Sequence, residues 1–181
     1  LWTLTQIQGA SGSYNMPAAL RLSGVLNARA LERALVDVME RHEPLRTVIA
    51  NVDGEPVGYV REFHRQTPLL EQEDLSTLQD VERTEALEQI IARDSTIPFD
   101  LSRDLMVRTR LIKLTETEHV LTLVMHHIAG DGVSMGVLCQ ELTQAYKKQT
   151  SGQTPDQAPG WAPVAVSYAD HAAWQRAWLE D

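Results

Sequence analysis

The run from Val120 to Met125 is the feature that most limits what this chain can fold into. Val120 and Val124 fall on one face of a strand built from this run. Leu121, Leu123 and Met125 fall on the other, so both faces are apolar. A strand that is apolar on both faces needs cover on both, as the inner strands of helix-flanked sheets have. The run therefore predicts a central strand in a layered fold.

Strand and helix patterns alternate along the rest of the chain. Alternating or apolar runs predict strands over residues 16–24, 45–51, 56–63, 105–113 and 119–127, and apolar stripes predict helices over 28–42, 77–94, 133–148 and 168–179. Asn27 is a predicted N-cap, and Ser76 with Gln79 forms a predicted capping box. The turn Asp53-Gly54 and the polar turn 115–118 predict two hairpins. The predicted fold class is α/β, in the sense of an α+β sandwich whose mixed sheet is flanked by helices.

The composition excludes several classes of function. The chain has 181 residues, of which 43% are hydrophobic and 23% charged, which suits one globular domain or one lobe of a larger domain. The net charge of −9 argues against binding to nucleic acid, and no apolar run is long enough to cross a membrane. A single cysteine and the absence of a signal-peptide pattern favour the cytoplasm. Because the chain starts without methionine, we expect it to be a piece of a longer protein.

The segment after the central strand combines paired histidines with an acidic residue and two glycines, in the order His126, His127, Gly130, Asp131, Gly132. Neighbouring side chains on a strand point to opposite faces, so we expect only one histidine to reach a substrate channel. The same geometry makes chelation of one ion difficult, and no metal site is predicted. A neutral imidazole is a natural general base, and the Gly132 amide can stabilise an oxyanion. A structural histidine and a helix N-cap at Asp131 are the plain alternatives.

Four segments of the chain resemble the motifs of the condensation domains of nonribosomal peptide synthetases. The doubled histidine with Asp131 and Gly132 is similar to the HHxxxDG signature. The other three are Leu1-Trp2, similar to the end of the opening motif, residues 41–47, similar to RHExLRT, and residues 168–174, similar to YxDFAxW with His171 in place of phenylalanine.

This resemblance implies a chloramphenicol acetyltransferase-like lobe. Residues 1–181 would be the N-terminal lobe of a two-lobed domain, with an α/β core at 1–149, a linker at 150–165 and a helix at 166–181 that leads to the C-terminal lobe. The resemblance also implies amide bond formation between thioesters. Upstream and downstream peptidyl carrier proteins would deliver the two thioesters on phosphopantetheine arms. The parent chain would also contain an adenylation domain. No cofactor would be bound directly.

The resemblance also assigns roles to residues. It implies that His127 is catalytic, as a base or as a group that positions the amine. It implies a structural role for Asp131, paired with an arginine for which Arg46 is the candidate, and it brings Gly132 close to the reacting thioester. His126 and Arg46 are the predicted supporting residues.

Alternative functions stay open at this point. They are a coenzyme A-dependent acyltransferase that shares HxxxD, an epimerisation-type relative, and a non-catalytic domain that recruits a partner protein. We expect the lobe alone to be inactive because the tunnel would be incomplete. We also expect Trp161, Trp174 and Trp178 to pack the last helix against the body, and the acidic run 71–74 to be a solvated loop.

Overall fold

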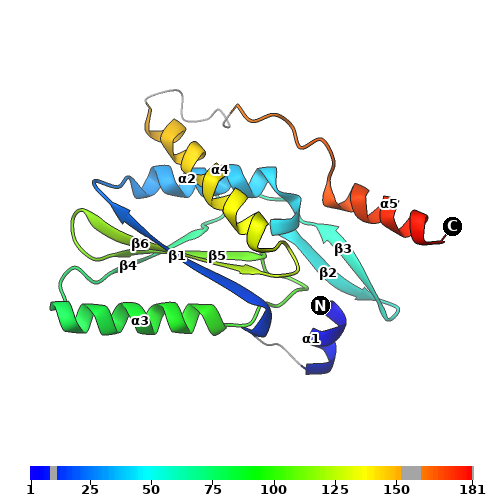
Figure 1. Cartoon of the computed structure of the whole chain (residues 1–181), viewed down its shortest axis with the longest axis horizontal. Coiled ribbons are helices and arrows are strands. Elements are labelled where there is room, and N and C mark those ends of the chain that lie inside the picture. The colour runs from blue at the N-terminus through cyan, green and yellow to red at the C-terminus, as the bar shows by residue number, and fades with distance from the viewer. Residues whose placement is uncertain (9–11, 152–159, 181) are drawn as a thin grey trace.

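The computed structural model describes residues 1–8, 12–151 and 160–180 of the chain (Figure 1). Its helices and short 3-10 turns are α1 (Trp2–Gln8), η1 (Gly12–Tyr14), α2 (Ala28–Arg41), η2 (Glu43–Arg46), α3 (Asp80–Thr96), α4 (Gly132–Thr150) and α5 (Tyr168–Glu180). Its strands are β1 (Asn15–Ser23), β2 (Thr47–Val52), β3 (Glu55–Val60), β4 (Leu70–Asp74), β5 (Val107–Lys113) and β6 (Glu118–His126). Half of the predicted linker 150–165, residues 152–159, lies outside the described residues.

Strand β6 lies inside a four-stranded sheet of order β1-β6-β5-β4. It pairs antiparallel with β1 on one side and with β5 on the other, while β4 pairs parallel with β5. The prediction of a central strand in a mixed sheet is therefore confirmed. Strands β2 and β3 form a separate hairpin.

The two faces of β6 are buried by different helices (Figure 1). Leu121, Leu123 and Met125 belong to the core that α2 and α4 complete, which includes Leu35 and Leu142. The opposite face lies against α3 and the loop that follows it. There Val120 packs with Ile90 and Ile112, and Val124 packs with Phe99 and Met106. The predicted division of the strand into two apolar faces is thus confirmed.

Local signals marked some helix and turn ends correctly. The side chain of Asn27 caps α2 by accepting a hydrogen bond from the Ala30 N–H at 3.0 Å. Asp53 and Gly54 adopt φ angles of +53° and +92° in the β2–β3 turn, which left-handed positions of a tight hairpin require. The capping box predicted at Ser76 and Gln79 is wrong. Ser76 bonds Asp74 instead, and Gln79 makes no side-chain cap.

The acidic run 71–74 is not a solvated loop, because it forms most of edge strand β4. Arg110 on the neighbouring β5 compensates its charge, with guanidinium distances of 2.5 Å to Glu71 and 3.3 Å to Glu73. Arg110 also bonds Asp94 of α3 at 2.6 Å. Burial alone would lower the pKa of Arg110, but Asp94, Glu71 and Glu73 more than offset it, so the net shift is upward.

Helix α5 lies beside the β2–β3 hairpin, away from the main sheet (Figure 1). The prediction that its tryptophans pack against the body is wrong, because Trp174 and Trp178 are 62% and 65% exposed and stack on each other. Only Trp161, before the helix, meets the body, with the Arg41 guanidinium 5.1 Å from its ring centroid. No helix among the described residues is long and apolar enough to span a membrane.

Truncating β6 at its centre should destabilise the whole fold. Leu123 is 0% exposed in the main core, so Leu123→Ala should lower the free energy of unfolding by about 2–5 kcal/mol. Val25→Ala is the control, since Val25 is 92% exposed and its truncation should change stability by less than about 0.5 kcal/mol. Chemical denaturation of the two variants measures both values. Equal stability losses would contradict the central position of β6.

Candidate active site

The two histidines at the end of β6 have opposite environments. His126 is the last residue of the strand and is 1% exposed, whereas His127 follows the strand and is exposed. The structure therefore exposes only one of the pair, as strand geometry predicted, and its access to a substrate channel stays a prediction. Both faces of β6 are apolar, so the strand pattern did not show which histidine would be buried, whereas the motif resemblance had implied that His127 is the exposed, catalytic one.

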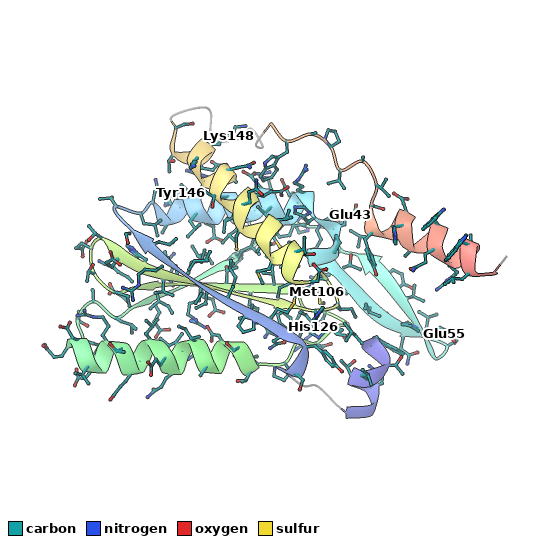
Figure 2. All side chains as sticks on the ribbon, in the orientation of Figure 1. Glu43, Glu55, Met106, His126, Tyr146 and Lys148 are labelled. Carbon is teal, nitrogen blue, oxygen red and sulfur yellow. The ribbon has the colours of Figure 1, made fainter. Side chains whose placement is uncertain are left out.

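His126 is held from several sides at the buried end of the strand. Its N–H donates to the Met106 carbonyl at 3.0 Å, and Figure 2 shows Met106 and His126 close together near the end of the sheet. Its ring Nδ1 accepts the Ile128 N–H at 3.0 Å, and its ring meets that of Phe99 edge to face. Burial lowers the pKa of His126, with smaller contributions from His127 and Arg108. His126 is therefore a neutral, structural histidine.

His127 faces a cleft of about 510 Å³. The walls come from three parts of the chain: the loop after β6, the first turns of α4 with Val133 and Val137, and the end of α2 with its 3-10 turn, at His42 and Pro44. Tyr168 of α5 closes one side. The backbone of His127 is fixed by its N–H, which donates to the Tyr14 carbonyl at 2.8 Å. The structure thus presents the His127 imidazole to a largely apolar cleft, which His42 also lines.

Asp131 is the N-cap of α4. Its Oδ1 accepts the Ser134 N–H at 2.9 Å and the Ser134 hydroxyl at 2.8 Å. The backbone and side-chain hydrogen bonds from Ser134 lower the pKa of the carboxyl, which keeps it charged at the positive end of the helix. The alternative that Asp131 is a helix N-cap is therefore correct. The cap holds the loop that connects His127 to α4.

The two glycines of this loop differ in what they require. A Cβ on Gly130 would lie 2.7 Å from the Cβ of Ser134 and 3.2 Å from the Met125 Cε, so a larger residue would displace the cap. A Cβ on Gly132 would meet nothing within 4 Å. Gly132 begins α4, and its predicted role near the thioester remains a prediction.

The predicted partnership of Arg46 with Asp131 is not formed. Arg46 lies in η2 and donates to the Arg61 carbonyl at 2.8 Å, and its guanidinium is 3.7 Å from Glu43. Its Nε is buried without a hydrogen-bond partner among the described residues. The 3-10 turn directs Arg46 toward β3 rather than toward α4, and Ser134 already satisfies Asp131.

Glu141 is a site residue that the sequence reasoning missed. From α4 it accepts the Arg41 Nε–H at 3.1 Å, and its other oxygen lies 2.6 Å from His42 Nε2. Arg41 also donates to the Ala162 carbonyl at 2.7 Å. These contacts join the end of α2 to α4, and so fix two walls of the cleft. A lone glutamate in a helix gives no sequence signal for such a role.

The model of the condensation domain family matches residues 1–181, and the chain belongs to that family. It corresponds to the N-terminal portion of such a domain. Condensation domains are acyl or peptidyl transferases that work with carrier proteins in multidomain synthetases. The resemblance and the fold class inferred from sequence, including the chloramphenicol acetyltransferase-like lobe, are both confirmed.

Among curated proteins, the chain is 41% identical over its whole length to the isonitrile lipopeptide synthase of Mycobacterium tuberculosis. It is 39% identical, again over its whole length, to the malpibaldin synthetase of Mortierella alpina. The chain spans only 7% and 3% of these two proteins.

Among solved structures, the X-domain from teicoplanin biosynthesis is similar over 99% of the chain, with 33% identity and a TM-score of 0.83. This chain covers 36% of that domain. The X-domain has also been solved in complex with OxyB, at 34% identity over 93% of this chain and a TM-score of 0.79, and there the chain covers 34% of the matched chain.

Burial of His126 should make stability depend on pH. Its folded pKa lies below the unfolded value of about 6.5, so above that pH both states are neutral and this contribution is complete. As pH falls below about 6.5, the unfolded state takes up the proton first. Stability then declines by up to about 1.4 kcal/mol per pH unit, until the lower folded pKa is reached. His126→Asn keeps an acceptor for the Ile128 N–H and should remove this slope in urea unfolding measured from pH 8 to 5. An unchanged slope would contradict the assignment.

Neutralising Glu141 should loosen the junction between α2 and α4. Glu141→Gln keeps the shape but loses the charge that faces Arg41 and His42, so stability should fall by about 1.5–3 kcal/mol. The exposed neighbour Gln140 provides the control, as Gln140→Ala should have little effect. Thermal unfolding of both variants tests this, and an unchanged Glu141→Gln midpoint would show that the contact adds nothing.

Proposed function

We propose that this chain supplies His127 to a condensation domain that joins a donor acyl or peptidyl thioester to an acceptor amine. The observation that carries the proposal is the division of the paired histidines. His126 is buried in the core, and of this pair only His127 faces the cleft beside the start of α4. Membership of the condensation domain family supports the same reaction class.

The chemistry requires one proton to move. The amine nitrogen attacks the thioester carbonyl, a C–N bond forms, the C–S bond breaks, and a thiol leaves. His127 accepts the proton that the amine loses, or orients the amine, and the departing sulfur is protonated in turn. An imidazole has the acidity for both transfers near neutral pH.

Two neighbours of His127 serve this step in different ways. The Gly132 N–H, at the positive end of α4, is proposed to stabilise the oxygen of the tetrahedral intermediate. Asp131 keeps that end of the helix in place through Ser134. His126 and Arg46 are proposed as supporting residues, with Arg46 acting on the η2 turn and its hairpin rather than on Asp131.

The reaction also requires partners that lie outside this chain. A C-terminal lobe is proposed to complete the tunnel, so the lobe alone should be inactive. Carrier proteins upstream and downstream would deliver both thioesters on phosphopantetheine arms, which belong to the substrates, and an adenylation domain would lie in the same parent chain. The proposed division of the chain is a core at 1–149, a linker at 150–165 and a helix at 166–181. A cytoplasmic location fits this assembly.

A condensation assay on the complete domain tests the proposal. Loaded donor and acceptor carrier proteins are mixed with the wild type or with His127→Ala, and the amide product is followed by mass spectrometry. The variant should lose roughly a hundredfold or more in rate, the range expected for a general base. His64→Ala is the matched control, because His64 is exposed outside the cleft lining.

The outcomes separate the competing functions. An unchanged rate in His127→Ala would place the chemistry elsewhere. Product formed from a coenzyme A thioester instead of a loaded donor carrier would identify a coenzyme A-dependent acyltransferase. Inversion of a carrier-bound residue without amide formation would identify an epimerisation-type relative.

Recruitment of a protein partner is a second candidate, favoured by the similarity to the X-domain that was solved with OxyB. In that case the complete domain would bind an unloaded partner protein, and no carrier pair would yield product. The motif His126-His127 with Asp131 and Gly132 is intact in this chain, which favours the catalytic proposal.

A further inference from the structure

The loop between α3 and β5 supports His126 from behind the cleft. Phe99 is 5% exposed, and its ring meets that of His126 at a centroid distance of 5.7 Å and an angle of 72°. Tyr14 contributes a second ring at 6.2 Å. These aromatic contacts restrict the orientation of the imidazole.

Arg108 of β5 holds Phe99 in place. Its guanidinium carbon lies 3.7 Å from the centroid of the Phe99 ring. The same group donates to the carbonyls of Ile97 at 2.9 Å and Pro98 at 2.7 Å, and to Asp104 at 3.1 Å. The planar guanidinium thus fixes both the Phe99 ring and the two peptide groups that precede Phe99. A lysine cannot make this set of contacts.

The orientation of the His126 ring matters for the backbone of His127. The His127 N–H bonds the Tyr14 carbonyl at 2.8 Å, and the next amide, that of Ile128, bonds His126 Nδ1 at 3.0 Å. Both peptide groups around the His127 Cα are therefore anchored. The second anchor exists only while the His126 ring presents an unprotonated Nδ1, with its proton on Nε2.

We propose that Phe99 and Arg108 are positioning residues for His127, which act through the orientation of the His126 ring. This inference rests on the proposed catalytic role of His127. Neither residue is among those that line the cleft of His127, so the proposed effect acts through His126 and not through the cleft wall. A small displacement of a catalytic group is costly because the reacting atoms must meet within a narrow range of distances.

The test uses the complete condensation domain with loaded carrier proteins. Phe99→Leu and Arg108→Lys should each lower kcat by roughly tenfold, while KM for the loaded carriers changes by less than about twofold. Nitrogen-15 NMR of the imidazole should show that the hydrogen bond to His126 Nδ1 is weakened in both variants. Arg108→Lys keeps the positive charge, so it remains informative if Phe99→Leu does not fold.

Arg103→Lys is the matched control, because Arg103 lies on the same loop. Its side chain is 78% exposed and pairs with Asp100 and Asp104. This variant should keep both the wild-type kcat and the wild-type imidazole signal of His126.

Three results would overturn the inference. The first is a weakened His126 signal in folded Arg108→Lys with kcat unchanged. The second is a fall in kcat with the signal intact, and the third is an equal fall in Arg103→Lys. His127→Ala in the same assay separates the two proposals: if it keeps full activity, the proposed function fails and this inference with it. If it loses activity and Arg108→Lys does not, only the inference fails.

Discussion

The need to bury strand β6 on both faces determines how the candidate site is built. Helices α2 and α4 cover one face, and α3 with its following loop covers the other. His126 continues the face of Val120 and Val124 and so enters the second layer, next to Phe99. Strand β6 ends at His126, so His127 lies beyond the sheet and packs in neither layer. The end of the strand therefore gives two adjacent histidines different environments: His126 is buried and His127 is exposed.

Much of this fold could be predicted because its signals are local. The two-faced apolar run marked the central strand, Asn27 marked the start of α2, and Asp53-Gly54 marked a turn that needs positive φ. For the candidate site, strand geometry predicted that only one histidine would reach a channel. Strand geometry did not show which of the two it would be. His126 is the buried one because it packs against Phe99, which is distant in sequence.

Apart from the capping box, which Ser76 loses to a local bond with Asp74, the errors have one physical origin, which is contact between residues distant in sequence. The acidic stretch at Glu71 and Glu73 looked like a loop because its neutralising partner, Arg110, lies on another strand. The tryptophans of α5 follow a helical spacing that shows which residues share a face, but not which face meets the body. Arg46 was paired with Asp131 from a motif, and the 3-10 turn sends it toward Arg61 instead.

Three elements form the walls of the cleft, and contacts outside the cleft fix each of them. Asp131 and Ser134 hold the start of α4, Glu141 joins α4 to the end of α2, and His126 anchors the backbone next to His127. None of these contacts uses the imidazole of His127. The interactions that hold the cleft together therefore lie behind and around it, apart from the side chain that faces it. The proposed role of His127 would depend on such an arrangement, because a catalytic side chain has to be held in place by residues other than itself.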